Sequence, residues 1–287
     1  MDVARVLARD FGAIEQEYSY KDTILYALGI GLGAKPLDPR HLRFLYEDGL
    51  QAMPSLANVL GHPGFWSKDP LYAIDWKQLL HAEQRMTIHS ALAPEGKVRS
   101  DIDIMGLRDL GQRGTMMHQR KRLTNAATGV EIATTISSLM LRGDVGSGDH
   151  GDAPPELEKL PDHAPERSLD IEAAEILPLI YRLSGDLNPL HIDPSIAAAA
   201  GFPRPILHGL ATKGIATYAV MSEYCGLEPA RLTSMSLRFS RPVLPGDMLR
   251  FEFWTDGSGT IRFRASVPGR DQIVLDRGVA IITGPAV

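Results

Sequence analysis

The feature that most constrains the fold lies in the second half of the chain, where one long apolar segment precedes several alternating runs. Apolar and polar residues alternate over residues 237–240, 251–253 and 261–267, and a last apolar run covers residues 273–282. This alternation is typical of strands with one buried face, and the turn residues between the runs separate those strands. Ahead of them, apolar residues recur at helical spacing over residues 207–225. We therefore expect one long helix that faces a meander of antiparallel strands.

The first half repeats this order with a weaker pattern. Residues 20–29 look like a weak copy of residues 174–185, and a helix interrupted by Pro54 is expected near residues 50–60. Strand-like runs follow at residues 85–92, 101–107, 115–123 and 131–141. Two related helix-plus-sheet units in one chain suggest duplication and fusion. The sequence therefore predicts an α+β fold built from two similar halves.

A clear break separates the two halves. Residues 143–167 are rich in glycine, proline and aspartate, and no apolar period of 2 or 3.6 survives there, which is the composition of a linker. We therefore expect an N-terminal domain over residues 1–142, a linker over 143–167 and a C-terminal domain over 168–287.

Composition limits the partners and the compartment. The 287 residues include 30 Lys and Arg against 35 Asp and Glu, and the net charge of −5 argues against nucleic acid or an anionic membrane as the main partner. No apolar stretch reaches the ~18 residues of a membrane span, and neither a secretory signal nor a peroxisomal Ser-Lys-Leu end is found. The single cysteine, Cys225, excludes an internal disulfide and a cysteine-based zinc site. These features predict a cytoplasmic protein.

The segment with the most candidate catalytic residues reads YRLSGDLNPLHIDP. It places a carboxylate (Asp186), an amide (Asn188) and an imidazole (His191) within six residues. Gly185 and Pro189 keep the segment from forming a regular helix, so its side chains can turn toward one point. Such a set is suited to general acid–base catalysis.

A second motif, PILHGL, opens the expected long helix about fifteen residues later. Backbone N–H groups at a helix start are unpaired and lie at the positive end of the helix dipole. Gly209 would let a ligand approach this backbone closely. Together the two motifs contain the parts of an acid–base site beside an oxyanion hole.

Plainer explanations exist for the same residues. Asp and Asn before proline often form a turn by bonding to their own backbone. His208 is expected to pack, or to form a structural hydrogen bond, at the helix start. A metal site made of His191, Asp193 and His208 is conceivable, but its spacing fits no zinc signature, so we expect no metal. The glycines of residues 29–33 lack the spacing of a nucleotide-binding loop and are expected to end a helix loosely.

Taken together, the two motifs resemble the signature of the MaoC-like (R)-specific enoyl-CoA hydratases, in particular the two-domain hydratase 2 proteins and the hydratase portion of peroxisomal multifunctional enzyme type 2. The likeness covers most of residues 175–250, and it is patchier at residues 26–29, 44–47 and 80–84. It implies a double hot-dog fold, two antiparallel sheets each wrapped around a helix, with the active centre in the C-terminal half. It also implies reversible syn addition of water to a trans-2-enoyl-CoA, giving a (3R)-3-hydroxyacyl-CoA. We expect a homodimer that needs no cofactor beyond the CoA of its substrate.

The resemblance also implies roles for single residues. Asp186 and His191 would bind the catalytic water. They would also transfer protons between this water and the C2 atom of the substrate. Asn188 would orient them, and the Gly209 N–H would stabilise the negative charge that develops on the thioester oxygen. The positions expected to contact acyl-CoA are His81, Ala82, Pro189, Leu190 and Phe239.

One position departs from the family pattern. Where the human member has a lysine near the CoA phosphates, within Asp-Lys-Gly, this chain reads Asp109-Leu110-Gly111. We expect Arg113, two residues beyond, to take over that contact.

Two other functions remain open. A hot-dog thioesterase would use a similar fold and ligand but would attack the carbonyl carbon, whereas Asp186, Asn188 and His191 set against Gly209 favour water at the β carbon. A non-catalytic acyl-CoA-binding subunit would not need an intact Asp/Asn/His set. Fatty, branched and sterol side-chain acyl groups all fit the sequence.

Overall fold

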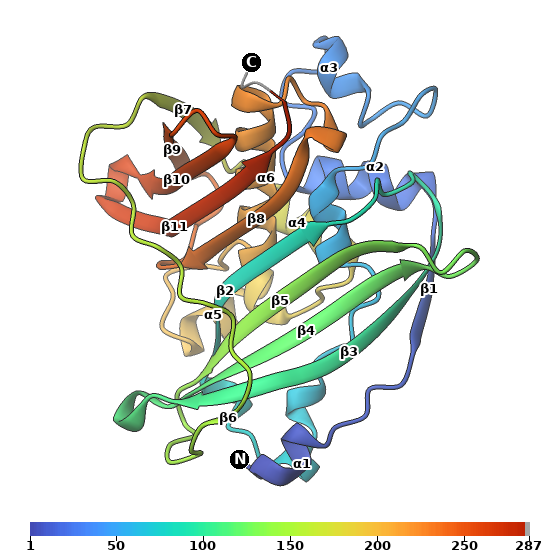
Figure 1. Cartoon of the computed structure of the whole chain (residues 1–287). Coiled ribbons are helices and arrows are strands. Elements are labelled where there is room, and N and C mark those ends of the chain that lie inside the picture. Colours follow the sequence, from blue (N-terminus) through green and yellow to red (C-terminus); the bar gives the residue numbers. More distant parts are fainter. Residues whose placement is uncertain (285–287) are drawn as a thin grey trace.

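The computed structural model describes residues 1–284 and contains one large antiparallel sheet (Figure 1). In that part of the chain the strands are β1 (Ile14–Tyr18), β2 (Leu79–Ile88), β3 (Gly96–Asp109), β4 (Thr115–Asn125), β5 (Glu131–Leu141), β6 (His150–Gly151), β7 (Arg167–Glu172), β8 (Leu232–Phe239), β9 (Met248–Thr255), β10 (Thr260–Val267) and β11 (Gln272–Ile282). The α-helices are α1 (Val3–Leu7), α2 (Tyr20–Gly29), α3 (Pro39–Leu42), α4 (Leu177–Tyr181), α5 (Pro194–Ala199) and α6 (Gly209–Tyr224). Among these helices, none is long and apolar enough to cross a membrane.

Short 3₁₀ helices connect these elements. They are η1 (Pro54–Asn58), η2 (Trp66–Lys68), η3 (Pro70–Tyr72), η4 (Trp76–Gln78), η5 (Gly111–Arg113), η6 (Arg182–Ser184), η7 (Pro189–His191), η8 (Pro229–Arg231) and η9 (Pro268–Arg270).

Strand order shows that the two halves are built alike. From the centre outward the N-terminal half runs β2-β5-β4-β3-β1 and the C-terminal half runs β8-β11-β10-β9-β7, so equivalent strands occupy equivalent places. The halves meet where β2 pairs antiparallel with β8, with Glu83 opposite Arg238 and Thr87 opposite Ser234. The fold is a double hot-dog, as expected, in which the two sheets join edge to edge into one.

Helix α6 is the central helix of the C-terminal half and lies behind β8 and β11 (Figure 1). The sequence pattern predicts one buried stripe, but every residue from Ala211 to Met221 is buried. A helix enclosed on all sides needs small or apolar residues all round, and this segment supplies them except at Lys213.

The N-terminal half has no comparable long helix at the corresponding place within the described chain. The expected helix near residues 50–60 is instead the five-residue 3₁₀ helix η1. Pro54 lacks an N–H and fits only the start of a helix, so the helix begins there. Gly61 then turns the chain with a φ of +61°, a conformation that favours glycine.

The predicted strands differ from the observed ones at the central strand β2 and at the two edges of the sheet. Strand β2 begins at Leu79 and ends at Ile88, whereas residues 85–92 were expected. The two outermost strands, β1 and β7, escape the sequence pattern because most of their residues are polar and only partly covered.

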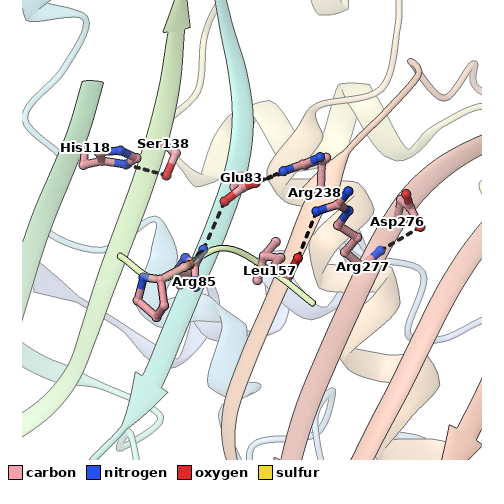
Figure 2. Close-up of polar contacts among 9 residues, drawn as sticks. Glu83, Arg85, His118, Ser138, Leu157, Arg238, Asp276 and Arg277 are labelled. Carbon is pink, nitrogen blue, oxygen red and sulfur yellow. Dashed lines mark hydrogen bonds and ion pairs between the residues drawn. The ribbon is translucent and has the colours of Figure 1, made fainter. Parts of the chain in front are cut away.

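The segment between the halves lies against the sheet. It contributes β6, which pairs with β3, and its Leu157 side chain is buried. Arg277 donates a hydrogen bond to the Leu157 carbonyl at 3.0 Å (Figure 2). Beneath it, the buried Glu83 carboxylate lies between Arg85 and Arg238, at 3.1 and 2.6 Å. These contacts fix the segment over the junction of β2, β8 and β11.

Candidate active site

The segment after α4 places the first candidate residue. Helix α4 is followed by η6 and then by Gly185, whose φ of +119° turns the chain away from the helix. The backbone N–H of Asn188 donates to Oδ1 of Asp186 at 3.2 Å. The Asn188 Oδ1 accepts from the Leu190 N–H at 3.2 Å and so caps η7, the turn that carries His191. Asn188 therefore holds both the Asp186 carboxylate and the turn of His191.

His191 is a buried imidazole, and within residues 1–284 only one of its ring nitrogens forms a hydrogen bond. Its Nδ1 lies 2.8 Å from the carbonyl oxygen of Ile206, and since a carbonyl only accepts, Nδ1 carries the proton. Burial lowers the pKa of His191, so the ring is neutral near pH 7. Its Nε2 then has a lone pair that can accept a proton.

His208 supports this pair from the start of α6. Its Nε2 donates to the backbone oxygen of Asp186 at 3.1 Å, and its ring stacks on His191 with centroids 3.8 Å apart. The Tyr181 ring lies 5.0 Å from it on another side. Burial, and then the neighbouring His191, lowers the pKa of His208. His208 thus fixes the backbone at Asp186 and the plane of the His191 ring.

Asp186, His191 and His208 gather their polar side-chain atoms within 4.8 Å of one another. The carboxylate considered for a metal site from the sequence, Asp193, lies outside this group because it accepts hydrogen bonds from Ser195 and caps α5. The group that could ligate a divalent cation therefore contains Asp186 in place of Asp193.

The start of α6 brings the two halves together. Gly209 is the first residue of the helix, where N–H groups lack partners within the helix. A Cβ at Gly209 would lie 3.6 Å from the Phe239 ring. The His81 ring lies 4.9 Å from Phe239, and Ala82 is the residue left unpaired at a bulge in β2. Gly209, Phe239 and His81 thus form one surface between the halves.

The other positions that were predicted to contact acyl-CoA lie in two different parts of the structure. Pro189 and Leu190 lie in η7 beside His191. Arg113 lies exposed in the turn between β3 and β4, and within residues 1–284 its side chain forms no ion pair or hydrogen bond with the protein. A contact of Arg113 with CoA phosphates stays a prediction.

The sequence analysis missed a buried polar row next to this surface. Gln84 connects His81 with Asn58, and Asn58 contacts two buried lysines, Lys121 and Lys213. The one signal in the sequence is a lysine in the middle of an otherwise apolar helix, at position 213.

Buried histidines predict how stability depends on pH. Burial lowers the pKa of His118 from 6.5 to about 4, and it also lowers the pKa values of His191 and His208. Between these values the unfolded chain binds protons that the folded protein does not bind. The free energy of unfolding should therefore be largest above pH 6.5 and decrease as the pH falls toward 4.

Urea unfolding across this pH range measures the effect. His118 lies on β4 beside Ser138, outside the candidate site (Figure 2). The variant His118→Gln should show a shallower pH dependence, because it removes one of the titrating groups. A slope identical to that of the wild type would contradict the argument.

The fold is a double hot-dog, and its C-terminal half brings Asp186, His191 and His208 together. The MaoC like domain matches residues 156–274, and the MFE-2 hydratase 2 N-terminal domain matches residues 16–143. The chain belongs to the MaoC-like hydratase 2 family.

Similar proteins span nearly the whole chain. The chain is 36% identical to 3-hydroxyacyl-thioester dehydratase Y of Mycobacterium tuberculosis, over 91% of this chain and 92% of that protein. It is 35% identical to the probable enoyl-CoA hydratase 2 of Dictyostelium discoideum, over 98% and 97%. The crystal structure of a MaoC-like dehydratase from Phytophthora capsici superposes with a TM-score of 0.88 at 28% identity, covering 99% of this chain and 98% of that one.

Proposed function

We propose that this protein is an (R)-specific enoyl-CoA hydratase, which adds water reversibly to a trans-2-enoyl-CoA to give a (3R)-3-hydroxyacyl-CoA. The observation that carries the proposal is the pairing of Asp186 with the neutral His191, beside the free N–H groups at the start of α6. The names of the relatives, an enoyl-CoA hydratase 2 and a 3-hydroxyacyl-thioester dehydratase, describe the two directions of this reaction.

The mechanism uses the two parts of the site in turn. The thioester oxygen accepts a hydrogen bond from the Gly209 N–H at the positive end of α6, which draws electron density from C3. A water held by Asp186 and His191 forms the new C–O bond at C3 and gives one proton to this pair. The resulting enolate collapses as the pair returns one proton to C2. Water is added and the pair ends in its starting state.

One assay distinguishes the proposed hydration from hydrolysis of the thioester. With crotonyl-CoA and longer trans-2-enoyl-CoA thioesters, we expect loss of the absorbance of the conjugated enoyl thioester without release of free thiol. Release of free CoA at the rate of absorbance loss would favour a thioesterase. No change in either signal across the panel would favour an acyl-CoA-binding subunit.

The product should be the (3R) alcohol. If Asp186 and His191 hold the water on one face of the double bond while Gly209 fixes the thioester oxygen, one enantiomer forms, and the resemblance to the (R)-specific hydratases implies that it is the (3R) form. Chiral chromatography of the 3-hydroxyacyl group measures the outcome. A (3S) product would contradict the proposed geometry, whatever the rate.

We further propose that the reaction needs neither a metal nor an added cofactor. The support for this is that the steps proposed above use only the Asp186 carboxylate, the Nε2 of His191 and the Gly209 N–H, while Nδ1 of His191 and Nε2 of His208 bond to backbone carbonyls. Hydration should therefore proceed at an unchanged rate after dialysis against EDTA. A loss of activity that zinc or magnesium restores would instead show that Asp186, His191 and His208 hold a metal.

The protein is also proposed to act as a homodimer in the cytoplasm. Support for an interface comes from apolar side chains near the site that are each more than a third exposed. They are Ile176, Leu179, Leu183, Leu187, Ile192 and Ile196. Light scattering should give a molar mass twice the 31.4 kDa of one chain. The mass of a monomer would contradict this part of the proposal.

A further inference from the structure

Lys213 is a buried amine with few partners. It lies on α6 one turn after Gly209, about 6 Å further along the same side of the helix. Its side chain is fully buried, and within residues 1–284 its Nζ forms a single hydrogen bond, to Oδ1 of Asn58 at 3.2 Å. An ammonium group has three N–H donors, so two of them lack an acceptor in the interior.

Lys121 provides the contrast. Its Nζ donates to the carbonyl oxygens of Ala57, Asn58 and Leu60, so all three of its N–H groups are used. Both lysines contact Asn58, and neither has an acidic side chain as an electrostatic neighbour in the described part of the chain. Burial, and for Lys213 also the neighbouring Lys121, lowers the pKa of each to about 7. The interior thus holds two buried amines without an acidic neighbour in the part of the chain that the structure describes.

This amine is connected to the candidate site by a row of polar side chains. Asn58 Oδ1 also accepts from Gln84 Nε2 at 3.1 Å, and Gln84 Oε1 accepts from His81 Nε2 at 2.9 Å. The His81 ring contacts Phe239, which covers Gly209. The row begins where the thioester is expected and ends at Lys213, between α6 and η1.

We propose that Lys213 is a specificity-determining residue that binds a carboxylate on the acyl chain of the substrate, so that the preferred substrates are enoyl-CoA thioesters with an anionic group on the acyl chain. This inference rests on the proposed hydration of enoyl-CoA. A carboxylate would supply both the missing acceptor and the missing counter-charge. A plain alkyl chain in the same place would leave the two N–H groups unsatisfied, which costs free energy.

The test compares two series of trans-2-enoyl-CoA thioesters of matched lengths, one ending in a methyl group and one in a carboxylate. The wild type should favour the carboxylate series in kcat/KM. Lys213→Met keeps the length of the side chain and removes its charge. It should lower kcat/KM for the best carboxylate substrate about 10- to 100-fold, the range of one charge-assisted hydrogen bond, while hydration of the methyl series continues at the wild-type rate or faster.

Lys121→Met is the matched control. It removes the other buried ammonium, whose donors are all satisfied, so it should lower thermal stability without changing the ratio between the two series. An unchanged ratio in Lys213→Met, or a wild type that favours the methyl series, would overturn the proposal.

Calorimetric binding of the corresponding saturated acyl-CoA pairs makes the test independent of turnover. Tighter binding of the carboxylate member by the wild type, lost in Lys213→Met, would support the role of Lys213 even if no substrate were hydrated. Failure of hydration across both series would refute the proposed function alone. Equal binding of both members would refute the role of Lys213.

Discussion

Replacing Asp186 by Asn or His191 by Gln should lower kcat for hydration by ~10²–10⁴-fold, the usual cost of losing a positioned acid–base group. Asn cannot accept and return a proton. Gln can keep a donor toward the Ile206 carbonyl, but it lacks the free Nε2 lone pair that His191 offers. The measurement is the loss of enoyl-thioester absorbance under saturating substrate.

Asp193→Asn is the matched control for these variants. Its carboxylate lies in the same stretch of chain but bonds to Ser195, and Asn is an equally good helix N-cap, so hydration should be unaffected. A variant of Asp186 or His191 that folds and keeps more than about a tenth of the wild-type rate would remove that residue from proton transfer.

Gly209→Val should lower kcat by ~10²–10³-fold, the cost of losing one oxyanion-hole donor. The N–H remains, but a Cβ at residue 209 would already lie 3.6 Å from the Phe239 ring, so the further methyl groups of valine should crowd the approach of the thioester to this N–H. The rest of α6 is buried and fixed, so the melting temperature should fall only modestly.

Gly209→Ala is the control that distinguishes steric crowding at the site from a general loss of folding. Its backbone is not in the left-handed region, and a Cβ would make only an ordinary contact with Phe239 at 3.6 Å. Alanine should therefore fold normally and give a rate between those of glycine and valine. If Gly209→Val folds and turns over like the wild type, the N–H of Gly209 has no oxyanion role.

The sequence predicts best the strands with one clearly buried face. The predicted run at residues 131–141 is β5 itself, and the run at 261–267 is β10 without its first residue. Edge strands such as β1 and β7 are harder to predict because exposed positions accept polar residues and leave no alternation to read. Near Pro54 the sequence predicts a longer helix than the structure contains. The apolar residues there pack into the core without forming a regular helix, so their pattern is misleading.

At the candidate site, the motifs identify residues but not their contacts. Asp186, Asn188 and His191 are close in sequence, so their grouping could be predicted from one segment. The stacking of His208 on His191 depends on where α6 begins relative to that segment. The contact of Lys213 with Asn58 joins residues 155 positions apart, and only the packing of α6 against η1 reveals it. Contacts of this kind follow from tertiary structure and leave no local pattern.

The central claim, that water is added across the enoyl double bond at this site, is tested most directly by mass spectrometry of a reaction run in ¹⁸O-labelled water. The wild-type protein should give an intact CoA thioester that carries ¹⁸O in a hydroxyl group at C3, and Asp186→Asn should give almost none. Label in the carboxyl group of a released free acid, or no label in any product, would contradict the account.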